Sequence, residues 1–517
     1  MFVTRLLFIS FALSLTIAAV ATGQDSSALP PVVITELKHL DETYRVLDAV
    51  AEKIWVGWND YRQVPFLLEY QNGLKVLIGH PNPPKEFQPL PGIKVGESQV
   101  FADRTALVAK ELVPPLAAGG GPIGFGSTAD GRSVEVVHMS FQPASQMESE
   151  GSGIRSTEEQ ILIYIHELFH CFQRSHIKNR VYGNLRFNAD AEYALYSEIE
   201  GMALHRAYLE PDPEKAALLL KEFLVARTLK RTATMSELQR NQESTDEFNE
   251  GTATYAEVRT LEVLKSGGYS AGLASSEDPA YHGFREPESM LKQYAARLLQ
   301  TASNVEYPYS KSYTYGCFQA LLSLRLFPGW QQSVTAGSGF IDADLAKHLP
   351  MTVEERSQIE QRLKVNYPVA EIRERNAKYL DARDAAYNRM KSRTGKVYVI
   401  DFKATGQYLS TVASRKGSYT LGLIYLYPQG LEPIKFDDVE LSRISAPAEI
   451  NQLYYIRAID TGDIKGAGSA KVEGTGQPDG SWKNAIVRTP LFTLHAPHVR
   501  IRTSGNLVKI QVLSRVK

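Results

Sequence analysis

Two histidines four residues apart constrain this chain more than any other feature, and they lie in the segment His166-Glu167-Leu168-Phe169-His170. Ser156 and Glu159 form a Ser-x-x-Glu capping box ahead of them, which predicts a helix from there to about Ser175. Residues four apart share one face of a helix, so both imidazoles can reach a single ion. Glu167 lies beside the first imidazole and can instead take a proton from a metal-activated water.

A zinc site of this kind needs a third protein ligand and keeps one position open for water. The leading candidate is Glu250, because Ser244 and Glu247 form a second capping box that predicts a helix start just before it. The small residues Gly251 and Ala253 would let that helix approach the histidine helix closely.

Glu200 is the alternative third ligand, since it also precedes a glycine and is closer in sequence to His170. It has a structural interpretation as well. A buried carboxylate needs a partner, and Arg227 or Arg231 could supply one. The sequence leaves both possibilities open.

Three short segments between residues 160 and 320 resemble the gluzincin metallopeptidases, especially the alanyl-aminopeptidase-like group. They are His166-Glu167-x-x-His170, Asn249-Glu250-Gly251-x-Ala253-x-Tyr255, and Tyr313-Thr314-Tyr315-Gly316, the last similar to the Tyr-Glu-Lys-Gly segment of that group. The resemblance implies that His166, His170 and Glu250 bind one Zn²⁺ ion. It also implies that Glu167 is the general base and that Tyr313 stabilises the oxyanion, with Tyr315 as the next candidate.

The chain departs from that group in two ways. The interval between His170 and Glu250 is much longer than in the family, which implies a helical insertion including residues 191–231. The Gly-x-Met-Glu-Asn segment, which anchors the substrate amino terminus in the family, does not occur.

Hydrophobic patterning divides the chain into regions. Residues 30–150 mix strand and turn patterns and predict an α/β region, with a hairpin between residues 64–70 and 74–78 around Asn72-Gly73. Residues 151–390 have mainly helical spacing, whereas residues 396–517 alternate short β-prone runs with turns. We therefore expect an α+β multidomain protein: an α/β region, a mainly helical zincin-type catalytic domain, and a β-sandwich-like C-terminal domain.

The first region is expected to carry the edge strand of the catalytic domain. Residues 134–141 are β-prone, and an extended peptide substrate could add to them as a further strand; the alternative is that they form a core strand. The glycine-rich stretch 117–131 is followed by these β-prone residues and not by a helix, so it predicts a flexible loop and not a phosphate-binding turn.

The N-terminus predicts export. Residues 1–23 hold Arg5, an apolar run from Leu6 to Ala21 and then small residues, as in a secretory signal peptide, with an uncleaved membrane anchor as the alternative. Cleavage would give a secreted or periplasmic protein without a membrane anchor.

Only two cysteines are present, Cys171 and Cys317, and they could form one disulfide or remain two buried thiols.

Charge argues against nucleic acid as a partner, because 57 basic and 58 acidic side chains give a formal net charge of −1 and no long basic run occurs.

Together the motifs, the region pattern and the N-terminal segment predict an exported zinc metallopeptidase, a hydrolase of peptide or protein substrates. A secreted binding module with a vestigial zinc site is one alternative, and a metallohydrolase of non-peptide amides or esters is another. Substrate identity, endo- or exopeptidase preference and oligomeric state are left open.

Overall fold

The structure is a computed structural model, and it describes the chain from residue 29 to residue 513 with gaps. The gaps are 71–72, 104–115, 144–155, 178–189, 274–277, 300–307, 338, 393–395, 403–411, 415–416, 421–423, 427–433, 437–440, 444–454, 461–470, 489–492 and 505–506. The expected signal peptide, residues 1–23, lies outside the described residues.

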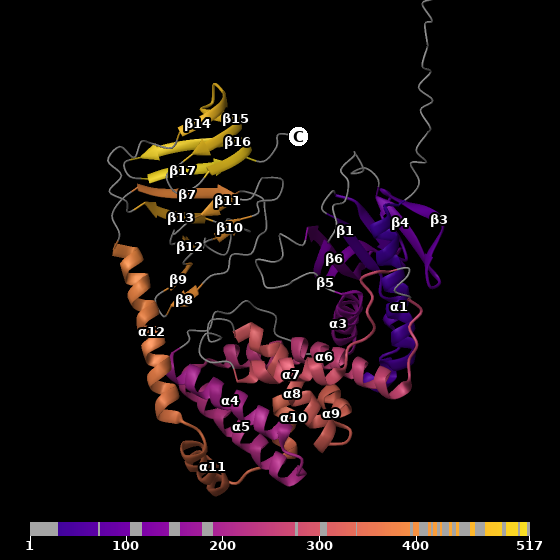
Figure 1. The fold of residues 1–517 in the computed structure, drawn as a ribbon, viewed down its shortest axis with the longest axis vertical. Coiled ribbons are helices and arrows are strands. Elements are labelled where there is room, and N and C mark those ends of the chain that lie inside the picture. The colour runs from indigo at the N-terminus through magenta and orange to yellow at the C-terminus, as the bar shows by residue number, and fades with distance from the viewer. Residues whose placement is uncertain are drawn as a thin grey trace, which may run out of the picture.

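The described chain is an α+β protein, as expected (Figure 1). Its helices are α1 (Pro31–Ile54), η1 (Tyr61–Gln63), α3 (Thr157–His176), α4 (Ala191–Leu209), α5 (Pro213–Thr234), α6 (Glu237–Gly267), α7 (Pro287–Leu298), α8 (Pro308–Leu326), α9 (Trp330–Ala336), α10 (Ile341–His348), α11 (Val353–Asn366) and α12 (Val369–Ser392). The strands before α3 are β1 (Phe66–Tyr70), β2 (Lys75–Ile78), β3 (Phe87–Val95), β4 (Ser98–Asp103), β5 (Leu116–Ser127) and β6 (Ser133–Pro143).

The first six strands form one sheet in the order β3-β4-β2-β1-β6-β5, and α1 and α3 lie beside it (Figure 1). The expected hairpin is confirmed, since β1 and β2 pair antiparallel with Phe66 opposite Ile78. β6 pairs parallel with β1 on one side and antiparallel with β5 on the other.

The prediction that residues 134–141 form the edge strand of the sheet is therefore wrong. Residues 134–141 belong to β6, which lies inside the sheet, and the edge is β5, the glycine-rich segment that we expected to be a loop. Glycines hide the alternating pattern by which strands are recognised, yet here they serve close packing. A Cβ at Gly120 would lie 1.9 Å from the carbonyl oxygen of His138 on β6, so a side chain has no room there.

The histidine helix forms as expected. α3 begins after Ser156, and both bonds of the Ser156–Glu159 capping box are present. The second expected helix start is wrong, because α6 begins after Ser236, which forms its own capping box with Gln239. Ser244 lies inside α6, where its hydroxyl accepts a hydrogen bond from Arg231 at 2.7 Å.

An aromatic cluster fixes α3 against α6. The ring of Trp55, just after α1, makes edge-on contacts with Phe169 of α3 and with Phe248 and Tyr255 of α6 at centroid distances of 5.5, 6.5 and 6.4 Å. Such pairs stabilise by about 0.5–1.5 kcal/mol each beyond their area burial. Because Phe169 precedes His170 and Phe248 lies two residues before Glu250, this packing places the two candidate ligand segments side by side.

The helices α6 and α8 cross closely at two glycines. A Cβ at Gly251 would lie 2.3 Å from the Cα of Gly316, and a Cβ at Gly316 would lie 1.8 Å from the carbonyl oxygen of Glu247. The expectation that Gly251 permits a close helix approach is thus correct, but the partner helix is α8 and not the histidine helix.

The C-terminal strands are β7 (Lys396–Phe402), β8 (Val412–Ser414), β9 (Gly417–Thr420), β10 (Ile424–Leu426), β11 (Ile434–Phe436), β12 (Leu441–Arg443), β13 (Tyr455–Asp460), β14 (Lys471–Gly476), β15 (Ser481–Arg488), β16 (Thr493–Ser504) and β17 (Leu507–Val512). They form a nine-stranded sheet in the order β14-β15-β16-β17-β7-β13-β12-β9-β8 and a ribbon of β10 and β11. A sandwich of packed sheets stays a prediction.

Two further features answer questions that the sequence left open. Cys171 and Cys317 are both buried and unbridged, so they are two separate thiols. In the part of the chain that the structure describes, no helix is both long enough and apolar enough to span a bilayer.

The glycine crossing gives a stability prediction. Gly316→Ala should lower the free energy of unfolding by about 1–3 kcal/mol, because the added methyl group meets the backbone of α6 and forces the helices apart. Gly267→Ala is the matched control, since a Cβ there would meet nothing within 4 Å and the change should stay within about 1 kcal/mol. Urea unfolding followed by circular dichroism measures both. Equal losses of stability in the two variants would contradict the proposed contact.

Candidate metal centre

Helices α3 and α6 bring three potential ligands together. One ligand atom from each of His166, His170 and Glu250 lies within 4.8 Å of the other two. The Oε2 atom of Glu250 is 3.4 Å from Nε2 of His166 and 3.5 Å from Nε2 of His170. All three side chains are largely enclosed, with 9%, 12% and 11% of their surfaces exposed.

These separations fit a tetrahedral ion. Ligand bonds of about 2.0–2.2 Å at tetrahedral angles hold the ligand atoms about 3.3–3.6 Å apart. The two measured distances fall inside this interval and are longer than good hydrogen bonds between the same atoms would be. Two imidazoles and one carboxylate also form the donor set that zinc accepts at catalytic sites.

Each histidine is oriented by a second side chain. Nδ1 of His166 lies 2.6 Å from Oε1 of Glu257, and Nδ1 of His170 lies 2.9 Å from Oε1 of Gln173. These oxygens accept hydrogen bonds from Nδ1, so in the neutral imidazole, the form that binds a metal, Nε2 has its lone pair towards Glu250. Carboxylate–histidine pairs of this kind fix the ring orientation and strengthen metal binding.

Neither of these orienting residues was predicted from the sequence. Glu257 lies seven residues after Glu250 on α6, which places the two carboxylates on the same helix face. Gln173 lies one turn after His170 on α3, and its amide also donates to the carbonyl oxygen of Asn249 at 2.9 Å. The seven-residue spacing of Glu250 and Glu257 is visible in the sequence and could have identified Glu257 as an orienting residue.

Charges inside the cluster support one another. Burial disfavours the charged form of Glu250, but His170 and His166, when their rings are protonated, outweigh it and hold the pKa of Glu250 well below its usual value. The Glu250 carboxylate is therefore ionised over the whole neutral range, as a metal ligand must be.

Glu167 lies beside this ligand group without belonging to it, and its carboxylate is close to strand β5. Its carboxylate is not among the three grouped atoms, and a Cβ at Gly121 on β5 would lie 3.7 Å from its Oε2 atom. Burial raises the pKa of Glu167 above that of an ordinary glutamate, which makes it a better proton acceptor.

The two candidate tyrosines occupy different places. The ring of Tyr313 stacks against His166 with centroids 6.0 Å apart and an interplanar angle of 17°. Tyr315 is buried, and its hydroxyl donates to the carbonyl oxygen of Ser197 at 2.5 Å. Tyr313 therefore lies at the candidate metal centre, whereas the hydroxyl of Tyr315 serves the packing of α8 on α4.

Glu200, the alternative ligand, lies away from the histidines in a cluster of ion pairs. Its Oε2 atom accepts from Lys230 at 2.7 Å, and its Oε1 atom is 3.5 Å from Nε of Arg227. The buried, paired interpretation thus describes Glu200, although its closest partner is Lys230 and not either of the two arginines named from the sequence.

Comparison with known proteins adds no family to these observations: no protein-family model, no curated protein and no solved structure matches the chain.

The orienting carboxylate gives a prediction on metal affinity. Glu257→Gln should weaken Zn²⁺ binding by about 10–100-fold, because the amide polarises and orients His166 less well than the carboxylate does. Glu262→Gln is the control on the same helix, since Glu262 pairs with Arg259 away from the histidines. Competition against a chromophoric chelator measures both affinities. Unchanged affinity in Glu257→Gln would show that this contact does not support a metal ligand.

Proposed function

We propose that the chain is a zinc-dependent hydrolase of peptide bonds. The observation that carries the proposal is the distance of the Glu250 carboxylate from both imidazoles, 3.4 and 3.5 Å, which matches the ligand separations of a tetrahedral zinc ion, with Glu167 beside the group. His166, His170 and Glu250 would hold the ion. When bound, Zn²⁺ supplies Lewis-acid polarisation of the scissile carbonyl and acidifies the attacking water.

The remaining chemistry falls to side chains of the protein. Glu167 takes a proton from the attacking water and passes it to the leaving amine nitrogen. Its raised pKa suits both steps, since a stronger base takes the proton more readily and the resulting acid still donates it. Tyr313, whose ring stacks on His166, would donate a hydrogen bond from its hydroxyl to the oxyanion that develops on the carbonyl.

The sheet edge favours peptides over other amides and esters. β5 is the outermost strand of its sheet, and Gly121 on β5 lies beside the Glu167 carboxylate. An extended peptide can add to such an edge through main-chain hydrogen bonds, which brings its own amide groups to the base. A glycine at this point leaves room for the substrate backbone.

The wider organisation belongs to the same proposal. Residues 151–390 would form a zincin-type catalytic domain of gluzincin type, completed by the edge strand from residues 30–150. Residues 396–517 would form an accessory β-sandwich-like domain. Export through a cleaved signal peptide would make the protein secreted or periplasmic.

Removal of the base and of the metal tests the reaction. Glu167→Gln should retain Zn²⁺ but lose at least about a thousandfold in kcat against a mixed peptide library, because the amide cannot accept a proton. Glu158→Gln is the matched control, since Glu158 is another buried glutamate on α3 and its Oε1 only accepts from the backbone of His282. Wild-type cleavage should disappear with 1,10-phenanthroline and return with zinc.

The same assay separates the alternatives. Zinc binding without chelator-sensitive cleavage of peptides, esters or other amides would leave a binding protein with a vestigial site. Cleavage of small esters or amides alone would indicate a non-peptide hydrolase. Wild-type turnover in Glu167→Gln would refute the assigned base.

Obstruction of the sheet edge tests the peptide path. Gly121→Val should lower kcat/KM for extended peptides by about tenfold or more, equivalent to about 1.4 kcal/mol, because the side chain occupies space beside Glu167. The fold should tolerate it, since the Cβ contact of 3.7 Å is ordinary. Zinc content serves as the control and should not change. Normal kcat/KM in this variant would place the substrate elsewhere.

A further inference from the structure

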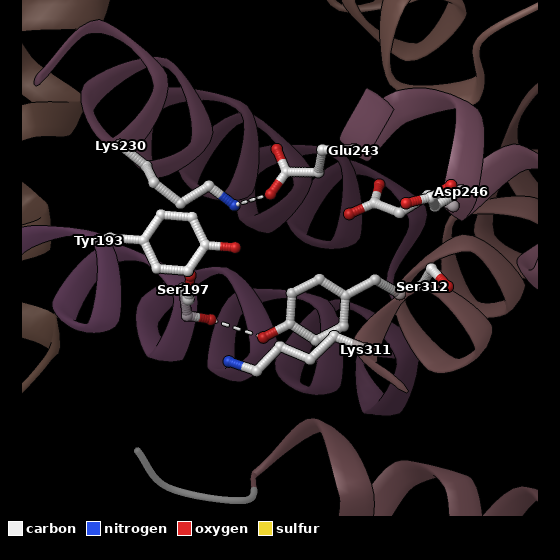
Figure 2. Close-up of a pocket in the computed structure, with 9 residues that line it drawn as sticks. Tyr193, Ser197, Lys230, Glu243, Asp246, Lys311 and Ser312 are labelled. Carbon is white, nitrogen blue, oxygen red and sulfur yellow. Dashed lines mark hydrogen bonds and ion pairs between the residues drawn. The ribbon is translucent and has the colours of Figure 1, made fainter. Parts of the chain in front are cut away.

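A second feature lies next to the metal centre, where α4, α5, α6 and α8 enclose a pocket that contains none of the metal ligands (Figure 2). Its polar lining includes Tyr193, Lys230, Asp246, Lys311 and Ser312. Lys230, Glu243 and Asp246 lie on one side of the space and Lys311 lies on the other, as Figure 2 shows.

The pocket adjoins the metal centre through two helices. Asp246 precedes Glu250 by one turn of α6, a rise of about 6 Å. Lys311 and Ser312 immediately precede Tyr313, whose ring stacks on His166. The pocket and the metal centre therefore share the helices α6 and α8.

Most charges around the pocket are neutralised by close partners. Lys230 donates to Glu200 and Glu243 at 2.7 Å each, and Arg227 donates through both terminal nitrogens to Glu247 at 2.6 Å each. Arg231 also donates to Glu243 at 3.0 Å and to Asp342 at 2.6 Å, so each of these carboxylates has a hydrogen-bonded cation. Burial raises the pKa of Asp246 to about 7, so its carboxyl group is largely uncharged below neutral pH and can then donate a proton to a ligand.

Lys311 is the exception. Its ammonium nitrogen is enclosed and has no hydrogen-bond partner among the described residues, and its nearest aromatic contact is the ring of Tyr315 at 5.8 Å. A buried ammonium without an acceptor is costly, typically by several kcal/mol. Burial correspondingly lowers the pKa of Lys311 to about 8. An acceptor from outside the chain would relieve this cost.

The size of the pocket limits what that acceptor can be. It holds about 310 Å³ counting its opening, but its interior has room for only about one water-sized group. One carboxylate oxygen fits this space. A phosphate dianion would bring more oxygens and more charge close to Glu243 and Glu247, so a monoanionic carboxylate is favoured.

We propose that this pocket binds a carboxylate group of the substrate, with the Lys311 ammonium as the principal donor. The carboxylate can be an aspartate or glutamate side chain or the free C-terminus of a peptide. The position of this subsite relative to the scissile bond rests on the proposed peptidase function, whereas carboxylate binding by Lys311 does not.

Binding tests the subsite without reference to catalysis. Calorimetric titration of the zinc-loaded full chain would compare N-acetylglutamate amide, N-acetylalanine and the neutral N-acetylglutamine amide. We expect binding of one or both carboxylates and not of the neutral probe, and at least tenfold weaker binding in Lys311→Met. Lys292→Met, at an exposed position on α7, is the control and should bind like the wild type.

Two outcomes would overturn the subsite. Carboxylate affinity that is unchanged in Lys311→Met would place the anion elsewhere, for example on the metal, and absence of binding to the wild type would exclude the site. Circular dichroism and zinc content check that the variant folds. Should it not fold, wild-type affinity between pH 7 and 9 decides, because loss of the Lys311 proton must weaken binding and a flat profile contradicts its role.

Cleavage assays identify which carboxylate is used and separate the two proposals. Peptides with glutamate in place of glutamine near the scissile bond, and peptides with a free in place of an amidated C-terminus, should differ in kcat/KM in the wild type and much less in Lys311→Met. Equal kcat/KM across both pairs would refute the subsite while peptide hydrolysis stands. Carboxylate binding through Lys311 without any peptide cleavage would refute the peptidase and leave the subsite.

Discussion

The packing of α6 against its neighbours is the constraint on which the candidate site depends. The aromatic cluster around Trp55 holds α3 and α6 together and so keeps Glu250 close to the two imidazoles of α3. On its other side, α6 contacts the backbone of α8 at Gly251 and Gly316. A metal site needs ligand positions fixed within a few tenths of an ångström, and dense packing of rigid helices provides that precision.

A cluster of buried ion pairs also connects α6 to α4 and α5, and the desolvation of these charges costs free energy. Arg227 and Lys230 of α5 pair with Glu243 and Glu247 of α6 and with Glu200 of α4, and all five side chains are buried. Buried ion pairs seldom add net stability compared with apolar packing, but loss of one partner is strongly destabilising. We interpret this cluster as a device that fixes the rotation of α6, and hence the directions of Glu250 and Glu257, while Lys311 is left with an unused donor at the border of the cluster.

Local rules predicted part of this structure well. The capping box at Ser156, the helix through His166 and His170, and the hairpin of β1 and β2 depend on interactions between residues close in sequence. The grouping of Glu250 with the histidines was also predicted, from its segment and the family resemblance. The predictions failed where long-range contacts overrode local pattern, as at Ser244, which binds Arg231, and at β5, whose glycines pack against β6.

The sequence by itself determined the chemistry that is available. It supplies two imidazoles one helical turn apart, Glu167 beside them, and a second glutamate, Glu250, in a segment of small residues. Only the tertiary structure decided which carboxylate meets the imidazoles, which side chains orient them, and which strand forms the sheet edge. The reason is physical. Spacing along a helix fixes side-chain directions within that helix, whereas distances between helices depend on side-chain packing across the whole core.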